Sequence, residues 1–168
     1  AYVPDTPRLE EYMTGMQYLN FVCDIYQISA KERKQNIERL IHAFQMEPHI
    51  SGLISSYSHG MKQKVALIAA FSHNPKLLVL DEPFVGLDPE AFIALKEQMK
   101  MLCRKGSSIL FSSHILDVVE KLCNIISIIK DGRLLYSGLT EELIGVEGLE
   151  DAFMELNSNE SFDPSIEK

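Results

Sequence analysis

The sequence has 168 residues, a formal net charge of −8, 46% apolar residues and 24% charged residues. This length suits one globular domain with a sizeable core, and no stretch approaches the roughly 18 apolar residues of a membrane span. The acidic balance argues against nucleic-acid binding, which usually needs a basic face. The three cysteines are widely spaced, which predicts buried free thiols in a reducing compartment.

The first half of the chain is predicted to be helical. Residues 1–8 are expected to be extended, because prolines restrict the residues that precede them. Capping residues and apolar periodicity then predict three helices, over about residues 14–26, 29–45 and 60–72. Thr14 can cap the first helix, and Ser29 with Glu32 forms a capping-box pattern for the second.

From residue 77 the pattern changes to alternating strands and helices. Leu77–Leu80 is a continuous apolar run that predicts a strand buried on both faces, as in a parallel sheet. Residues 108–113 predict a second buried strand, and Asp131-Gly132 predicts a hairpin turn. The other expected elements are helices near residues 89–106, 115–122, 141–144 and 149–156, and strands at residues 125–129 and 133–136. This order predicts a parallel α/β sheet, with the helical block as a separate lobe.

Two adjacent carboxylates, Asp81 and Glu82, follow the strand at 77–80 directly. Acids at the end of a buried strand are costly unless they hold a cation or move a proton. A second acidic turn, residues 86–89, contains Asp88. The alternative is a strand that happens to end in a solvated acidic turn.

Two further sites carry polar groups at the ends of predicted elements. Ser58 and Gly60 stand at the start of the third helix, where free N–H groups and the helix dipole favour an anion. The alternative for Ser58 is a plain helix cap. His114 follows the second strand, and ligands of open α/β sheets bind at such strand ends, although a lone histidine is more often structural.

In this order the motifs resemble those of ATP-binding cassette (ABC) ATPases. Residues 76–89 are similar to the Walker B motif and D-loop, and His114 matches the switch histidine. Residues 57–61, Tyr-Ser-His-Gly-Met, resemble the signature motif, which is usually Leu-Ser-Gly-Gly-Gln; His59 replaces its first glycine. Residues 2–5 resemble the Q-loop segment, with Asp5 in place of the glutamine. The resemblance implies a partial P-loop NTPase sheet with an attached helical subdomain.

The resemblance also implies a role for each acidic residue and for the histidine. Asp81 would bind Mg²⁺ through a water, and Glu82 would act as general base on the water that attacks ATP. His114 would contact the γ-phosphate, and Asp5 would stand at the Q-loop position.

The signature residues imply a second subunit. By the resemblance, Ser58, His59 and Gly60 would cover ATP held by an opposing ABC ATPase subunit in a head-to-tail dimer. Asp88 would lie across the interface of that dimer.

The sequence pattern and the resemblance together predict four parts of the chain. They are a Q-loop segment (residues 1–8), a helical subdomain (9–73), part of an α/β core (74–156) and a disordered tail (157–168). The implied function is that of the ATPase subunit of a bacterial ABC transporter, cytoplasmic and peripheral on the inner face of the cell membrane. The helical block would dock on an integral membrane permease. The Asp5-Thr-Pro opening, residues 58–64 and residues 149–156 look most like the Ecs-type and related exporter ATPases.

Two other functions are compatible with parts of the sequence. One is a soluble ABC-type ATPase acting on the ribosome or on nucleic acid, which the acidic charge disfavours. The other is a non-hydrolytic interaction module, which the presence of Asp81, Glu82 and His114 disfavours.

No Gly-x-x-x-x-Gly-Lys-[Ser/Thr] phosphate loop occurs in the 168 residues. In the family this loop precedes the Q-loop, so the chain is expected to be the C-terminal part of an ATPase domain. We therefore expect these residues alone to show no appreciable ATP hydrolysis or tight nucleotide binding. In P-loop folds of this class, the strand that leads into this loop lies between the strands matching residues 108–113 and 125–129. Its absence would leave two unpaired sheet edges, so we also expect the isolated piece to oligomerise, to swap a strand or to be marginally folded.

Overall fold

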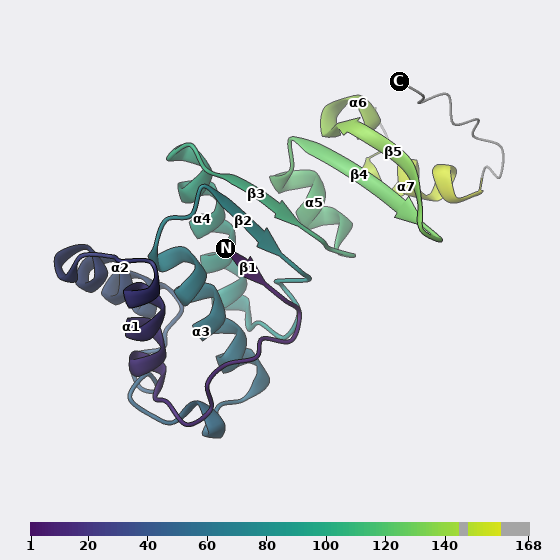
Figure 1. Cartoon of the computed structure of the whole chain (residues 1–168). Helices are drawn as coiled ribbons and strands as arrows, with labels where there is room; N and C mark the ends of the chain where they lie inside the picture. Colours follow the sequence, from purple (N-terminus) through teal and green to yellow (C-terminus); the bar gives the residue numbers. More distant parts are fainter. Residues whose placement is uncertain (145–147, 159–168) are drawn as a thin grey trace. The chain divides into compact units, whose positions relative to one another are not determined.

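The structure, a computed structural model, describes residues 1–144 and 148–158. The chain folds into two compact units, Ala1–Ser112 and Ser113–Lys168, each taken by itself below. Figure 1 shows the elements of each unit in chain order. In the described ranges, no helix has both the length and the apolar character that crossing a bilayer requires.

The first unit begins with helices whose starts agree with the predicted caps. Helix α1 spans Gly15–Ile25, and Thr14 forms a full capping box with Gln17. Helix α2 spans Ala30–Ala43, where the Ser29 hydroxyl accepts from the Glu32 N–H. The Thr14 cap is confirmed, and Ser29 caps α2 as predicted, although its hydroxyl donates to the Glu32 carboxylate in place of the reciprocal bond of a capping box.

Helix α3 is the centre of the first unit. It spans His59–Ser72, after a 3₁₀ turn at Ile54–Ser56, and most of its residues from Val65 onward are buried. It packs against α1, α2, strand β1 (Tyr2–Val3) and helix α4 (Pro89–Arg104). The fully buried large apolar side chains of this unit are Leu19, Leu40, Phe44, Met46, Ile54, Leu67, Ile68, Leu78, Leu80 and Leu95.

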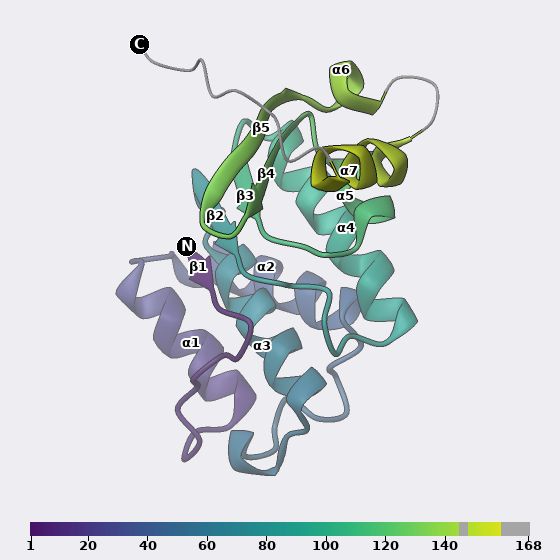
Figure 2. The same cartoon turned by 90° about the vertical axis from the view of Figure 1, so that its right-hand side faces the viewer.

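The sheet of the first unit is parallel, as predicted. Strands β1, β2 (Leu77–Leu80) and β3 (Ser108–Phe111) lie in the order β1-β2-β3. Val3 pairs with Leu80, and Leu80 pairs with Phe111. Helices α3 and α4 cover one face of this sheet, as the two views in Figures 1 and 2 show.

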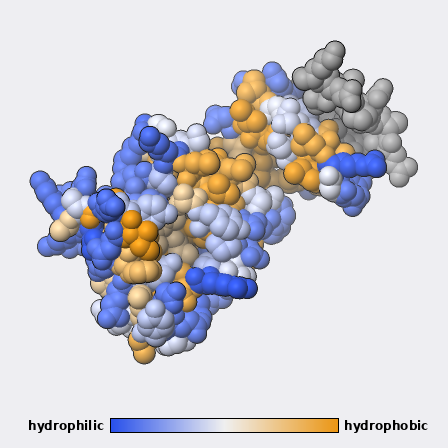
Figure 3. Space-filling model, viewed as in Figure 1, coloured by the Kyte–Doolittle hydropathy of each residue, from blue (hydrophilic) through white to orange (hydrophobic). Residues whose placement is uncertain are grey.

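The expectation that β2 and β3 are buried on both faces is wrong. Leu78 and Leu80 are buried, whereas Leu77 on the other face is 53% exposed and Leu110 is 64% exposed. The physical reason is that the helices of this unit pack on one face only. Figure 3 shows the resulting apolar surface over the strands.

The second unit contains an antiparallel hairpin. Strand β4 (Ile125–Lys130) pairs with β5 (Arg133–Leu139). Asp131 and Gly132 adopt φ values of 51° and 75°, the left-handed pair that a tight hairpin turn requires. The predicted turn is confirmed, and β5 runs three residues further than expected.

Among the described residues of the second unit, the helices are α5 (Leu116–Leu122), α6 (Thr140–Ile144) and α7 (Leu149–Ser158). Helix α7 packs on α5, where the Leu149 N–H donates to Glu120 Oε2 at 2.9 Å. The predicted tail begins inside α7, which continues through residue 158; residues 159–168 lie outside the described ranges.

The compact units differ from the predicted division at residue 73. Helix α3 packs on the other helices and also on β1, so the helical block and the sheet form one unit. That the four predicted ranges act as separate functional parts stays a prediction. The expectation of buried thiols holds for Cys23 but is wrong for Cys103, which is exposed, and Cys123 is half-buried.

We predict that helix α4 stabilises the protein through its sheet-facing side alone. Leu95→Ala removes a side chain that is 0% exposed, and should lower the free energy of unfolding by about 2–5 kcal/mol. Ile93→Ala, on the same helix but 60% exposed, should cost about 0.5 kcal/mol or less. Urea denaturation of both variants measures the difference. Equal costs would contradict the one-sided packing.

Candidate active site at the ends of the parallel strands

The candidate site lies where the three parallel strands end. Asp81 follows β2 directly, Ser112 follows β3 directly, and Asp5 comes two residues after β1. The Asp81 N–H donates to the Val3 carbonyl at 2.9 Å, and the Ser112 N–H donates to the Leu80 carbonyl at 3.0 Å. Parallel pairing therefore brings these three chain segments to one edge, where open α/β sheets bind ligands.

A serine hydroxyl joins the two predicted carboxylate residues. Ser112 Oγ donates to Asp81 Oδ1 at 2.6 Å and accepts from the Glu82 N–H at 2.9 Å. Hydrogen bonds to a charged carboxylate are short and strong. Ser112 thus fixes the Asp81 carboxylate and the backbone of Glu82 at the same time.

Glu82 stands in an unusual backbone conformation. Its φ is +42°, in the left-handed region that side-chain-bearing residues rarely adopt, at a cost of about 1–2 kcal/mol. Phe84 is 4% exposed and packs against Phe92 and Phe111, with ring centroids at 4.8 and 6.0 Å. The packing of Phe84 holds the turn that contains Glu82. Backbone strain like that at Glu82 is concentrated at functional sites.

The predicted anion site lies at the first turn of α3. Ser58 is the N-cap, and its hydroxyl accepts from the Met61 N–H at 3.3 Å. The capping alternative is therefore confirmed. Accepting that bond leaves the hydroxyl proton able to donate, so the cap and an anion contact are compatible.

The start of α3 touches the acidic turn at two glycines. A Cβ on Gly60 would lie 2.7 Å from the Gly86 carbonyl oxygen, so no other residue fits there without a backbone shift. Gly86 has φ +75°, and a Cβ there would meet the His59 ring at 3.0 Å. His59, which replaces the usual glycine of the signature motif, thus packs on the predicted D-loop turn.

Both oxygens of the Asp88 carboxylate have partners within the chain. Oδ1 accepts from the Ala91 N–H at 2.8 Å and caps α4, while Oδ2 lies 2.5 Å from Lys64 Nζ. The Lys64 ammonium, followed by the Ala91 N–H, holds the pKa of Asp88 below its ordinary value. The pair's stabilisation is therefore present above the ordinary carboxyl pKa and is lost as pH falls through the lowered value. That Asp88 reaches a second subunit stays a prediction.

His114 belongs to the second unit. It is exposed, and the neighbouring Ser113 hydroxyl accepts from the Ile115 N–H at 3.1 Å. Its cooperation with Asp81 and Glu82 stays a prediction.

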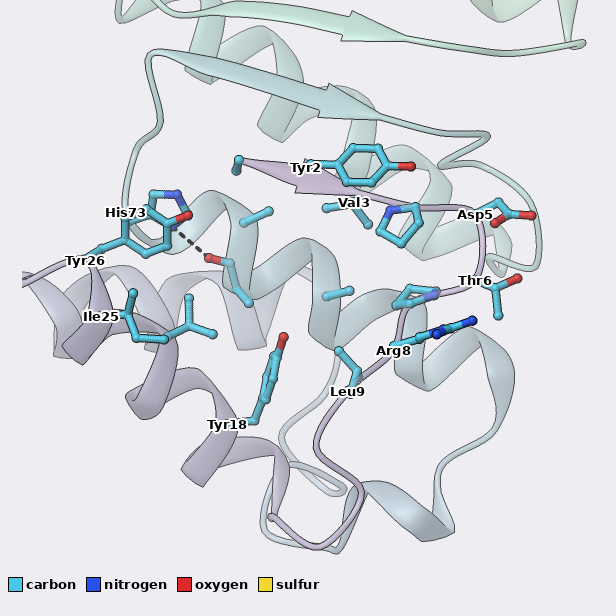
Figure 4. Close-up of a pocket in the computed structure, with 17 residues that line it drawn as sticks. Tyr2, Val3, Asp5, Thr6, Arg8, Leu9, Tyr18, Ile25, Tyr26 and His73 are labelled. Atoms are coloured by element: carbon cyan, nitrogen blue, oxygen red, sulfur yellow. Dashed lines mark hydrogen bonds between the residues drawn. The ribbon is translucent and has the colours of Figure 1, made fainter.

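A groove of about 630 Å³ runs along the first residues of the chain (Figure 4). It lies between residues 1–9, α1 and α3, and Asp5 stands at its end beyond β1. Tyr18 points from α1 into the groove, and burial followed by the charge of Glu10 raises its pKa. Tyr26 stacks on His73 with centroids 3.7 Å apart, and burial lowers the pKa of that histidine.

The donor set suits a magnesium ion held mainly by a nucleotide. Across residues 1–144 and 148–158, no cluster of three or more His, Cys, Asp or Glu side chains is placed to hold a metal ion. Mg²⁺ typically takes one or two carboxylates and completes its shell with phosphates and waters. Asp81, oriented by Ser112, fits that requirement.

Sequence reasoning missed two residues of the site, Ser112 and Lys64. The signal for Ser112 was present, because it follows the second parallel strand as Asp81 follows the first. Lys64 carried no local signal, since its partnership with Asp88 depends on how α3 approaches the turn.

Comparison with known proteins places this chain in a family. Residues 27–120, more than half of the chain, match the family model described as "AAA domain, putative AbiEii toxin, Type IV TA system". The chain is 36% identical over 155 residues to the ABC-type transporter ATP-binding protein EcsA of Bacillus subtilis, covering 92% of this chain and 63% of EcsA. It is 35% identical over 143 residues to the ABC transporter ATP-binding protein NatA of the same organism, covering 85% of this chain and 58% of NatA.

A solved structure agrees with these relatives. The structure described as that of the ATP binding subunit of an ABC transporter superposes with a TM-score of 0.89 at 35% identity, covering 94% of this chain and 68% of that one. The protein belongs to the family of ABC transporter ATP-binding proteins. The chain spans about 63% of the length of EcsA.

We predict that Ser112 is needed to order the acidic pair. Ser112→Ala removes both hydrogen bonds of the hydroxyl and should lower the free energy of unfolding by about 1 kcal/mol. Ser108→Ala, at the other end of the same strand, is the matched control. Urea denaturation, with the NMR shift of the Glu82 amide as a local readout, checks the result. A Glu82 amide unmoved in Ser112→Ala would contradict the bridging role.

Proposed function

We propose that this chain is the ATP-hydrolysing part of a bacterial ABC transporter and couples ATP hydrolysis to transport through a membrane permease. The observation that carries the proposal is the bridge from Asp81 through Ser112 to Glu82, at the ligand-binding edge of a parallel sheet. Phosphoryl transfer needs positioned groups and charge neutralisation rather than covalent chemistry. This arrangement supplies a positioned Asp81 carboxylate and a fixed backbone for Glu82.

In this proposal each acid has one role. Asp81 would hold Mg²⁺ through a water, and the bound ion would neutralise phosphate charge. Glu82 takes the proton of the attacking water as general base. The left-handed backbone of Glu82 fixes the direction from which its carboxylate approaches.

The remaining residues would complete the site from both sides. His114 would contact the γ-phosphate, and Asp5 would take the Q-loop position. Ser58, His59 and Gly60 would cover ATP held by a second subunit in a head-to-tail dimer, using the positive end of α3. A phosphate loop outside these 168 residues would hold ATP itself.

The permease contact would lie along the groove beside α1. Its lining includes Ile25 and Tyr26, which are 59% and 50% exposed, and Tyr12 on the approach to α1 is 73% exposed. Exposed apolar side chains beside a groove suit an inserted segment of a partner protein. The ATPase would thus lie at the cytoplasmic face of the cell membrane. The relatives are transporter subunits and the net charge is −8, so action on ribosomes or nucleic acid is not favoured.

We predict that Glu82→Gln abolishes turnover without abolishing ATP binding. In the transporter assembled with its permease, the variant should hydrolyse ATP roughly 10²–10⁴-fold more slowly, the usual contribution of a general base. Glu90→Gln makes the same charge change at an exposed position of α4 and should leave the rate near that of the wild type. Phosphate release and ATP-analogue binding are measured together. Retained hydrolysis in Glu82→Gln would refute the assignment.

A further inference from the structure

The anion-binding end of α3 and the acidic turn after Glu82 are held together at two levels. Their backbones meet where Gly60 approaches the Gly86 carbonyl. One turn further along α3, Lys64 reaches the Asp88 carboxylate. All four residues lie in the first compact unit.

The lysine of the Lys64–Asp88 pair is more buried than the lysines of two other ion pairs, those of Lys62 and Lys121. The Lys64 side chain is 11% exposed, whereas Lys62, paired with Glu11 at the same distance of 2.5 Å, is 25% exposed. Lys121, also at 2.5 Å from its partner Asp117, is 59% exposed. A buried ammonium is costly without a partner. Lys64 therefore depends on Asp88 more than Lys62 or Lys121 depends on its own carboxylate.

Asp88 connects this lysine to a third element. Its other oxygen caps α4, whose N1 position is Pro89. The single Asp88 carboxylate thus links α3, the turn and α4. At Gly60 and Gly86 the backbones of α3 and the turn are in direct contact, with no space for a side chain between them. The start of α3 and the turn that follows Glu82 are therefore joined both by a backbone contact and by the Lys64–Asp88 pair.

We propose that Lys64 is a positioning residue that acts through Asp88, making the Ser58–Gly60 loop and the Gly86–Asp88 turn move as one body. The proposed function, on which this inference rests for its catalytic consequence, places the loop over ATP and Glu82 on the attacking water. Lys64 then aligns the two without touching either. In that arrangement, the Asp88 carboxylate contacts the Lys64 ammonium and the Ala91 N–H of its own chain.

The mechanical part of the proposal is tested without ATP. Hydrogen–deuterium exchange of the amides in residues 84–91 and 58–62 is compared in Lys64→Met, Lys64→Arg and Lys62→Met. Lys64→Met should speed exchange in both segments, because the pair is lost. Lys64→Arg keeps a cation and should restore protection, and Lys62→Met should leave residues 84–91 unchanged. Unchanged exchange of residues 84–91 in Lys64→Met would overturn the proposal.

The catalytic part is tested by steady-state kinetics of the transporter assembled with its permease. Lys64→Met should lower kcat about tenfold with little change in KM, within the roughly hundredfold that a 1 Å misplacement can cost. Lys64→Arg should recover most of kcat. Asp88→Asn, which keeps a capping side chain but loses the charge, should match Lys64→Met and covers the case in which that variant folds poorly. A raised KM at unchanged kcat would overturn a positioning role.

The two proposals fail in different ways. A wild-type transporter that hydrolyses no ATP would refute the proposed function while leaving the exchange result intact. Normal kcat in both Lys64→Met and Asp88→Asn, with Glu82→Gln inactive, would refute the positioning role alone.

Discussion

The pairing of β2 with a parallel strand on each side is the constraint on which the candidate site depends. Because β1, β2 and β3 run in one direction, the segments that leave their carboxyl ends emerge at one edge. Backbone bonds from Asp81 to Val3 and from Ser112 to Leu80 extend the sheet by one residue beyond the strands. The Ser112 hydroxyl can then reach both the Asp81 carboxylate and the Glu82 N–H.

A second constraint ties this edge to the start of α3. The first turn of α3 presents a helix N-terminus, and the glycine contact between Gly60 and Gly86 brings it against the turn that follows Glu82. Asp88 completes the connection by capping α4 while it pairs with Lys64. The acidic turn, the first turn of α3 and the start of α4 therefore form one assembly.

Local chemistry determined what could be predicted from the sequence. The caps at Thr14 and Ser29 and the turn at Asp131-Gly132 are specified by neighbouring residues, so they were predicted correctly. The exposure of Leu77 and the pairing of Lys64 with Asp88 depend on which elements pack together. A run of apolar residues or a single lysine in the sequence does not specify that packing. Asp81 and Glu82 were found because two acids after a buried strand are costly without a purpose. Their serine partner comes from the neighbouring strand.

The central claim is that the strand ends hold the metal–nucleotide complex, and affinity cleavage tests it most directly. Fe²⁺ replaces Mg²⁺ in the transporter loaded with ATP, and ascorbate with peroxide then generates radicals that cut the backbone beside the metal. Mass spectrometry maps the cuts. The account predicts ATP-dependent cleavage at residues 81–82, and none at Gly106, which precedes the opposite end of β3. ATP-dependent cuts elsewhere in the chain, with residues 81–82 intact, would contradict it.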